Sequence, residues 1–510
     1  MTIRHVIRKE TYFDSVTLMQ ITNEVKKLQG VENAVVGMGT DFNIDSLKRL
    51  GLYSDAFAGI TPADLLLCVQ AGDDAAADAA LAAAEKLLTT RKKASGAGTA
   101  FVPPTQEAAA KQLPDANVVV ISVPGAWAAR EAEIALRAGR HVMLFSDNVT
   151  VEEELKLKTL GVEKNLLVMG PDCGTALING VPLAFANAVR RGDIGIVAAS
   201  GTGLQEVTSL IHTMGYGITQ AIGVGGRDLS EKIGGKMTLM AAHALGEDPA
   251  TKVIVLISKP PAPSVLGPLY AELKKIRKPI VVYFIGADPE AIRKEGFTPA
   301  HNLQEAAQKA CELSGGKAVA VPMTDADAAA KADGLRLPGK YLRGLYSGGT
   351  LCDEAQRLLH PVLADLYSNT PVKGCQMLHS VHKSEKHTIV DLGDDEFTRG
   401  RAHPMIDPTL RQERIVIETA DPDVGLIAFD VVLGYGAHMD MAGEMVAAIE
   451  KARKASGRKP VFAACICGTA DDPQNMQKQK RTLEDAGVQV FPSNVALIAF
   501  VKRAMAGKGV

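Results

Sequence analysis

Two short turns rich in serine, threonine and glycine are the residues best suited to binding a charged ligand. The first, Ser200-Gly201-Thr202-Gly203, follows the apolar run Ile194–Ala199 and precedes a helical pattern of apolar residues. Such a run is typical of a buried parallel strand. A helix that begins directly after it has unpaired N–H groups and the positive end of its dipole, so it can bind an anion. The alternative is an ordinary helix cap by Ser200 or Thr202.

The second turn, Ser347-Gly348-Gly349-Thr350, repeats this layout within residues 343–358. The repeat continues downstream, because the strand-like segment at residues 278–286 is echoed at residues 459–468. Two similar units, each with an anion-binding helix start, predict that two helix dipoles face one phosphate.

A third polar cluster spans residues 391–408 and combines acidic side chains with Arg399, Arg401 and His403. The two arginines could clamp a carboxylate or phosphate, and His403 could transfer a proton. The alternative is a charged loop held together by internal ion pairs.

A polar loop near the start of the sequence is a fourth candidate. Arg8, Lys9 and Ser15 belong to this loop, which follows a predicted strand at residues 3–7 and precedes a predicted helix at residues 15–28. Loops of this kind bind ligands in open α/β sheets. The alternative is a solvated loop that caps the helix through Asp14 or Ser15.

Composition limits the function classes. A chain of 510 residues predicts about three domains at roughly 150 residues each, and a net charge of −2 gives no support for a nucleic-acid or anionic-membrane partner. The sequence has no long apolar run and no apolar signal-peptide core at its start, and its seven cysteines suit a reducing compartment. We therefore expect a cytoplasmic protein, and the absence of paired histidines predicts no metal site.

Strands at residues 118–123, 141–145 and 166–169 alternate with amphipathic helices, which predicts parallel sheets with right-handed crossovers. We expect a first domain at residues 1–165 and a second at 166–318. Residues 319–340 are an expected linker, and residues 341–510 form the third domain.

Several of these motifs resemble known enzymes. The α subunit of ADP-forming succinyl-CoA synthetases is similar over residues 115–260, on the segments Ser122–Gly125, Ala135–Gly139, Gly170–Gly174, Gly195–Thr202 and Gly223–Gly226. Gly348-Gly349 with Cys352-Asp353 resembles the carboxy-terminal domain of the β subunit. The full layout, including residues 7–15 and 401–408, resembles the FdrA family across essentially the whole chain.

The resemblance implies an α/β fold, with a Rossmann-like CoA-binding-type domain followed by two flavodoxin-like parallel-sheet domains. It suggests Asp172 and Cys173 as substrate-binding residues. It also places Lys259 where the synthetases have the glutamate that orients their phosphorylated histidine, and the histidine loop itself has no counterpart after residue 286. Lys259 could hold a phosphate directly, or it could be an ordinary solvated lysine.

The predicted function is a component of an acyl-phosphate-dependent transferase, which the FdrA resemblance narrows to oxamate carbamoyltransferase in allantoin and ureide nitrogen catabolism. Lys259 and His403 are the expected catalytic residues. The alternatives are an ADP-forming acyl-CoA synthetase and a non-catalytic scaffold subunit. We expect an acyl phosphate and a carboxylate as substrates, other protein subunits as partners, and a homo-oligomer as a further candidate. No cofactor is assigned, with coenzyme A at Arg8, Lys9 and Ser15 as the candidate.

Overall fold

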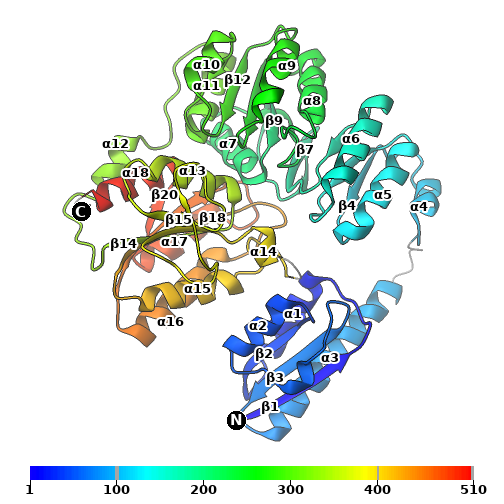
Figure 1. Cartoon of the computed structure of the whole chain (residues 1–510), viewed down its shortest axis with the longest axis vertical. Helices are drawn as coiled ribbons and strands as arrows, with labels where there is room; N and C mark the ends of the chain where they lie inside the picture. The colour runs from blue at the N-terminus through cyan, green and yellow to red at the C-terminus, as the bar shows by residue number, and fades with distance from the viewer. Residues whose placement is uncertain (98–102, 399–400, 507–510) are drawn as a thin grey trace. The chain divides into compact units, whose positions relative to one another are not determined.

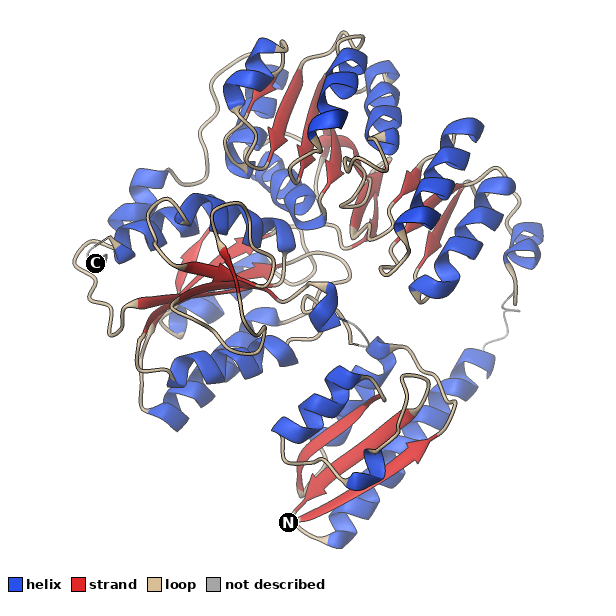
Figure 2. Ribbon diagram, viewed as in Figure 1, coloured by secondary structure: helices blue, strands red, loops and turns tan. Residues whose placement is uncertain are grey.

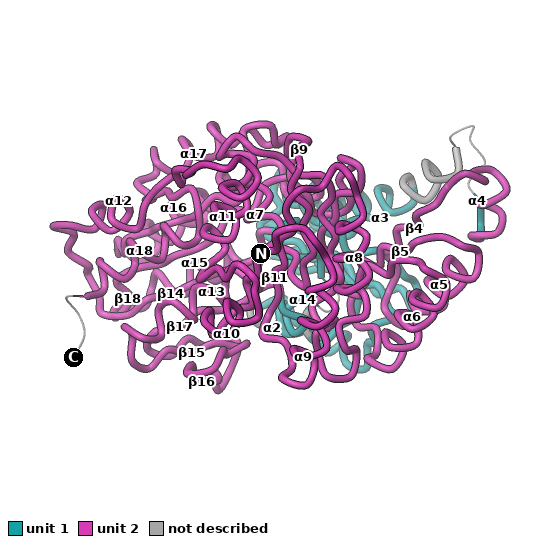
Figure 3. The backbone as a smooth tube through the Cα atoms, turned by 90° about the horizontal axis from the view of Figure 1, so that it is seen from above, with its two compact units in different colours: residues 1–104, 394–407 teal, residues 105–393, 408–510 magenta. Residues whose placement is uncertain are grey.

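The structure is a computed structural model that describes residues 1–97, 103–398 and 401–506 (Figures 1 and 2). The chain divides into two compact units. The first contains residues 1–104 and 394–407, and the second contains residues 105–393 and 408–510 (Figure 3).

The first unit has a three-stranded antiparallel sheet in the order β1-β3-β2. Its central strand is almost entirely apolar and buried, and Leu18, Ile21 and Val25 of α1 pack on the sheet from one helix face. Its elements are β1 (Thr2–Arg8), α1 (Ser15–Lys26), β2 (Val31–Met38), α2 (Asp41–Arg49), the short 3-10 helix η1 (Asp55–Phe57), β3 (Leu65–Ala71), α3 (Asp74–Ala97) and α14 (Asp395–Thr398).

This division differs from the expected single domain at residues 1–165, because that range contains two separate sheets. The expected strands at residues 3–7 and 34–38 exist as β1 and β2, but each pairs with β3 in the antiparallel direction. An apolar run shows that a strand is buried and leaves its direction open, so the sequence alone favoured a parallel arrangement here.

The second unit begins with a small parallel sheet in the order β4-β5-β6. Lys158 of α6 ties this sheet to the next one, because its buried ammonium donates to Glu154, to Asp228 and to the carbonyl of Val224, each at 2.8 Å. The elements are α4 (Gln106–Gln112), β4 (Val118–Ile121), α5 (Gly125–Arg137), β5 (His141–Leu144), α6 (Val151–Lys164) and β6 (Val168–Met169).

A seven-stranded sheet follows in the order β13-β12-β11-β9-β10-β7-β8. Strands β9 to β13 are parallel, and the β7–β8 hairpin adds an antiparallel edge. The elements are β7 (Thr175–Ile178), β8 (Val181–Ala184), β9 (Arg191–Ala199), α7 (Gly201–Thr213), β10 (Ile218–Gly223), α8 (Lys236–Glu247), β11 (Val253–Ser258), α9 (Pro263–Leu273), β12 (Ile280–Phe284), α10 (Pro289–Lys294), β13 (Thr298–Pro299) and α11 (Leu303–Gly315).

A second seven-stranded sheet is parallel throughout, in the order β16-β15-β17-β14-β18-β19-β20. The expected linker that precedes it carries a short helix, α12 (Asp325–Ala330). The elements of this sheet region are β14 (Tyr341–Tyr346), α13 (Gly349–Leu359), β15 (Leu366–Ser368), β16 (Gln376–Met377), β17 (His387–Asp391), α15 (Thr409–Ala420), β18 (Val424–Val432), α16 (Met441–Ser456), β19 (Val461–Cys467), α17 (Met476–Asp485), β20 (Gln489–Phe491) and α18 (Asn494–Met505).

The α/β fold class with parallel sheets is therefore confirmed. Buried apolar strands separated by helices build these layers, as the alternation in the sequence indicates. Within the described residues, no helix is both long enough and apolar enough to span a bilayer.

Candidate functional site at two helix starts

Helix α7 begins at the carboxyl end of β9, directly after the buried strand. Ser200 caps it, with its hydroxyl oxygen accepting a hydrogen bond from the N–H of Gly203 at 3.0 Å. The N–H groups of Gly201 and Thr202 precede the first intrahelical hydrogen bond, so the helix itself offers them no acceptor. The α7 start therefore presents N–H donors and the positive end of the helix dipole at one edge of the sheet.

Helix α13 begins in the same way after β14, but its donors have a different partner. The N–H and hydroxyl of Ser347 and the N–H of Gly348 all donate to the carboxylate of Asp430, at 2.8–2.9 Å. Asp430 is fully buried on β18 and forms an ion pair with the buried Arg411 at 2.9 Å. The donors of Ser347 and Gly348, which the sequence analysis assigned to a phosphate, thus hold a carboxylate of the chain itself.

The two helix starts contact each other directly. The hydroxyls of Ser200 and Thr350 are hydrogen-bonded at 2.6 Å across the two sheet regions. A methyl group built on Gly348 would lie 2.7 Å from the side-chain methyl of Thr202, so a glycine is needed there for the close approach. The repeated turns are therefore brought together, with one turn's threonine against the other turn's glycine.

Lys259 reaches the same place because of strand register. Ser258 pairs with Ala199 between β11 and β9, so Lys259 and Ser200 follow neighbouring strands at the same level. The ammonium of Lys259 lies 3.1 Å from the carboxylate of Asp353 on α13. Thr350 and Asp353 are three residues apart, so the lysine is held on the helix face that carries the threonine.

The charges around Lys259 keep it protonated. Burial lowers the pKa of its ammonium, but the attraction of Asp353 and Asp391 outweighs burial and raises that pKa above its ordinary value. Burial raises the pKa of Asp353, and Lys259 opposes this shift. Asp391 ends β17 beside Tyr346 of β14, and its carboxylate would lie 2.6 Å from a methyl group built on Gly349. The α13 start is thus surrounded by carboxylates.

The loop that contains the predicted substrate residues lies against α7. Thr175 follows it, and its buried hydroxyl, which has no hydrogen-bond partner in the described structure, lies 3.8 Å from a methyl group built on Gly201. Cys173 is buried, and burial raises the pKa of its thiol to about 12, so the thiol is protonated at neutral pH. Asp172 is exposed on the adjoining turn.

The predicted arginine and histidine cluster belongs to the first compact unit, whereas Lys259 belongs to the second. Arg401 donates to the hydroxyl of Ser46 at 3.1 Å, and the imidazole Nδ1 of His403 accepts a hydrogen bond from the N–H of Met405 at 3.2 Å. Arg399 lies outside the described residues.

The candidate cofactor loop also lies in the first unit, and its cations have internal partners. Arg8 forms an ion pair with Glu85 at 2.7 Å, and Lys9 forms one with the buried Asp64 at 3.0 Å. Ser15 begins α1, and Asp14 caps that helix by accepting the N–H of Thr17. The observed geometry matches the solvated, capped loop that was the alternative interpretation.

Two residues of the paired helix starts, Asp430 and Thr175, were missed in the sequence analysis. Asp391 was included there only as the first residue of the cluster at 391–408. Asp430 had a usable signal, since a single carboxylate inside an otherwise apolar strand must be paired when it is buried. Thr175 begins an ordinary strand sequence, and only strand order brings Thr175 and Asp391 to the site.

Comparison with protein families matches three segments of the chain, and the first of them coincides with most of the first compact unit. A family model described as "AllF, heavy metal-associated domain" matches residues 1–103, one described as "CoA binding domain" matches residues 189–286, and one described as "CoA-ligase" matches residues 345–504. The CoA-binding match therefore lies in the second expected domain, whereas the sequence analysis expects the CoA-binding-type domain at residues 1–165.

The residues of the first unit do not fit a heavy-metal ion. Soft metals are bound by thiolates, and residues 1–103 contain a single cysteine, Cys68. Cys68 is buried in β3, and burial raises the pKa of its thiol to about 12. Among the described residues, no group of three or more potential metal-ligating side chains is found.

Relatives of known name cover the chain to different extents. The α subunit 2 of the ADP-forming succinate–CoA ligase of Archaeoglobus fulgidus is 26% identical over 231 residues, which is 42% of this chain and 77% of that one. The ADP-forming sulfoacetate–CoA ligase subunit SqwL of an Acholeplasma species is 27% identical over 24% of this chain and 43% of its own. The solved ATP citrate lyase of Methanothrix soehngenii, with citrate and coenzyme A, matches with a TM-score of 0.36 and 18% identity over 46% of each chain, so this chain spans less than half of that structure.

Protein YahF of Escherichia coli (strain K12) is 44% identical over 507 residues, which is 98% of each chain. YahF is an FdrA family protein, and the matched domains occur along this chain in the order that the FdrA resemblance implies. This chain belongs to the FdrA family and carries acyl-CoA-ligase-type domains.

Proposed function

We propose that this chain transfers an acyl group from an acyl phosphate in a reaction of the ADP-forming acyl-CoA ligase type, with the phosphoryl group bound at the α7 start. The observation that carries the proposal is the contact of the two helix starts, with the Ser200 and Thr350 hydroxyls 2.6 Å apart beside Lys259. The CoA-ligase and CoA-binding matches and the succinate– and sulfoacetate–CoA ligase relatives support this class of reaction.

Charge favours α7 over α13 as the phosphate-binding helix start. Asp430 already occupies the Ser347 and Gly348 donors, and Asp391 lies beside Gly349, so an anion at α13 would meet like charges. The α7 start instead has hydroxyl groups around it, including the unpartnered hydroxyl of Thr175. Hydroxyls and N–H groups donate to phosphate oxygens at no cost in charge repulsion.

The proposed step transfers the acyl group from phosphate to an acceptor. The acceptor forms a new bond to the acyl carbon, and the bond between that carbon and the bridging phosphate oxygen breaks. The electron pair of the broken bond stays on phosphate, and the acceptor's proton passes to that phosphate. Lys259, held by Asp353, lies where its positive charge would stabilise the departing phosphate as negative charge develops. Coenzyme A, when bound, supplies a thiol as the acyl acceptor.

The start of α5 fits a nucleotide better than the Arg8–Ser15 loop does. No side chain caps α5 and its first turn contains no acidic residue, so the positive end of the helix dipole there favours a phosphate. Trp127 and Val123 are exposed at the same end, and an aromatic face can stack on adenine. We therefore place coenzyme A at the α5 start, because the cations at Arg8 and Lys9 are already paired.

Binding of a stable analogue tests the proposal directly. Acetylphosphonate, which resists hydrolysis, should bind the purified chain in calorimetry, and Ser200→Ala should weaken this binding at least tenfold through loss of the hydroxyl and the cap. Ser347→Ala is the matched control, since the same residue type at the α13 start faces Asp430. Equal weakening by both variants, or no binding by the unaltered chain, would contradict the assignment to α7.

Carbamoyl transfer to oxamate is the second candidate. It is favoured by Lys259, whose ammonium beside Asp353 could stabilise a phosphate leaving group without a phosphorylated histidine. The comparisons favour the acyl-CoA ligase class over it. Phosphate release from acetyl phosphate or carbamoyl phosphate, measured with coenzyme A or oxamate as acceptor, separates the two. Release that depends on coenzyme A supports the first candidate, and release that depends on oxamate supports the second.

A further inference from the structure

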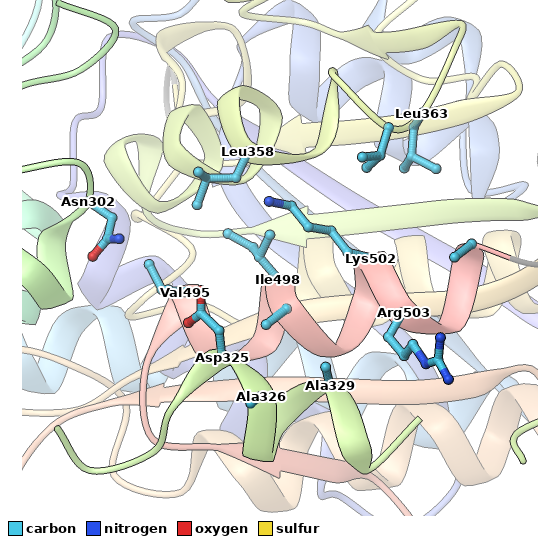
Figure 4. A pocket seen from close by; sticks show the side chains of 13 residues that line it. Asn302, Asp325, Ala326, Ala329, Leu358, Leu363, Val495, Ile498, Lys502 and Arg503 are labelled. Atoms are coloured by element: carbon cyan, nitrogen blue, oxygen red, sulfur yellow. The ribbon is translucent and has the colours of Figure 1, made fainter. Parts of the chain in front are cut away.

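A cavity of about 490 Å³ lies between α12, the carboxyl-terminal part of α13 and α18 (Figure 4). Leu358 and Leu363 line one side of it, and Val495 and Ile498 line the other. The spacing of the α18 residues places Lys502 on the same helix face, because positions i, i+3 and i+7 lie in one stripe. A lysine therefore occupies a position on an apolar helix face.

Lys502 has no carboxylate partner among the described residues. Its side chain extends across the cavity toward Leu358 in Figure 4. The neighbouring Arg503 is different, since both its Nε and an Nη nitrogen lie 2.7 Å from Asp333. Lys502 is half-buried beside apolar side chains, and such an ammonium can pair with an anion that brings its own apolar surface.

We propose that this cavity binds a small monocarboxylate with an apolar body, with the carboxylate on Lys502 and the body against Leu358 and Ile498. The volume suits a molecule of up to roughly fifteen non-hydrogen atoms, if each takes about the 30 Å³ of a water molecule. A single unpaired cation matches a single negative charge. A phosphate dianion would need more donors, and Asp325, which also lines the cavity, would repel its two charges more strongly than the one charge of a monocarboxylate.

This site is separate from the helix starts. Leu358 lies nine residues after Gly349 on α13, which is about 14 Å at 1.5 Å per residue. The N-cap Asn302, which lines the cavity, uses its side-chain oxygen to accept the N–H of Glu305, so the α11 start is capped there. The proposal therefore does not depend on phosphate binding at α7.

Titration of the full-length chain with hexanoate tests the site, with hexanol and hexylamine as ligands of the same length and different charge. Ligand-observed NMR should show saturable hexanoate binding that is at least tenfold tighter than hexylamine binding. Lys502→Gln should weaken hexanoate binding at least tenfold and change hexanol binding less than twofold. Lys480→Gln, a half-exposed lysine on α17 that does not line the cavity, should leave both unchanged.

Two variants that fill the cavity complete the test. Ile498→Trp and Ala329→Leu should each abolish binding of hexanoate and hexanol, and thermal melting identifies any variant that fails to fold. Absence of saturable hexanoate binding, or hexanoate binding that survives Lys502→Gln or both filled variants, would overturn the proposal. Equal affinity for hexylamine would also overturn it, because Asp325 would then be the anchor. Loss of hexanoate binding in Ser200→Ala would assign the ligand to the helix starts instead.

Discussion

Helices α7 and α13 begin with nearly the same residues after nearly the same kind of strand, yet their serines have different partners. Ser200 caps its own helix and bonds to Thr350, whereas Ser347 donates to Asp430 on a neighbouring strand. The repeated sequence therefore determines the conformation of each turn. The charges on adjacent strands determine which group its serine contacts.

The difference is electrostatic. Asp353, Asp391 and Asp430 lie around the α13 start, where Lys259 pairs with Asp353 and Arg411 pairs with Asp430. The α7 start has hydroxyl groups at the corresponding place. An anionic ligand is attracted to the helix dipole at α7 and repelled by the carboxylates at α13.

The largest effect that the comparison predicts is on stability at α13. Asp430→Ala removes the acceptor for three donors and leaves Arg411 buried without its carboxylate. Breaking a buried ion pair from one side costs about 3–5 kcal/mol, so the free energy of unfolding should fall by about this amount in denaturant titration. Asp423→Asn, at an exposed carboxylate just before β18, is the control. A loss below about 1 kcal/mol for Asp430→Ala would mean that Asp430 does not organise the α13 start.

The next effect is on catalysis and separates the two serines. Ser200→Ala should lower the rate of acyl phosphate use tenfold to roughly a hundredfold, since it removes a hydroxyl and a cap at the proposed phosphate site. Ser347→Ala should change the same rate less than about threefold while lowering stability by about 1–2 kcal/mol. Phosphate-release kinetics and melting measure the two quantities. The reverse pattern would assign the phosphate to α13.

A third effect concerns the buried acids on the second turns of the two helices. Burial raises the pKa of Glu206 on α7 to about 8 and that of Glu354 on α13 to about 7. Asn494 joins them, because its N–H donates to Glu206 and its side-chain amide donates to Glu354.

Between pH 5 and pH 8 the folded chain keeps the Glu206 proton, whereas the unfolded chain loses it near the ordinary value of 4.5. The unfolding free energy should therefore fall as pH rises through this range, by up to about 1.4 kcal/mol per pH unit for one group. Glu206→Gln should flatten this dependence, and exposed Glu163→Gln should not. An unchanged slope in Glu206→Gln would show that Glu206 is ionised in the folded chain.

The smallest effect tests the hydrogen bond between the helix starts. Thr350→Val removes one hydrogen bond to Ser200 and should cost about 1 kcal/mol of unfolding free energy. Thr350→Ser keeps the hydroxyl and should retain most of that stability. If the serine variant loses as much as the valine variant, the contact of the threonine methyl beside Gly203 contributes as much as the hydrogen bond.

Much of the fold could be predicted from local pattern. Buried apolar runs alternating with amphipathic helices predicted the parallel sheets of the second unit, and the repeated Ser-Gly turns predicted the starts of α7 and α13. The arrangement of residues 1–97 could not be predicted in this way. The direction of β3 relative to β1 and β2 depends on long-range pairing, and an apolar run is compatible with either direction.

At the paired helix starts, the sequence by itself determined the residue types: small hydroxyl and glycine residues at two helix starts, and a lysine after a buried strand. Only the tertiary structure decided their partners. Strand order brings Asp430 to Ser347 from 83 residues away, and strand register brings Lys259 level with Ser200. The reason is physical: a turn is formed by neighbours in the chain, whereas the charge that it meets depends on which strands lie side by side.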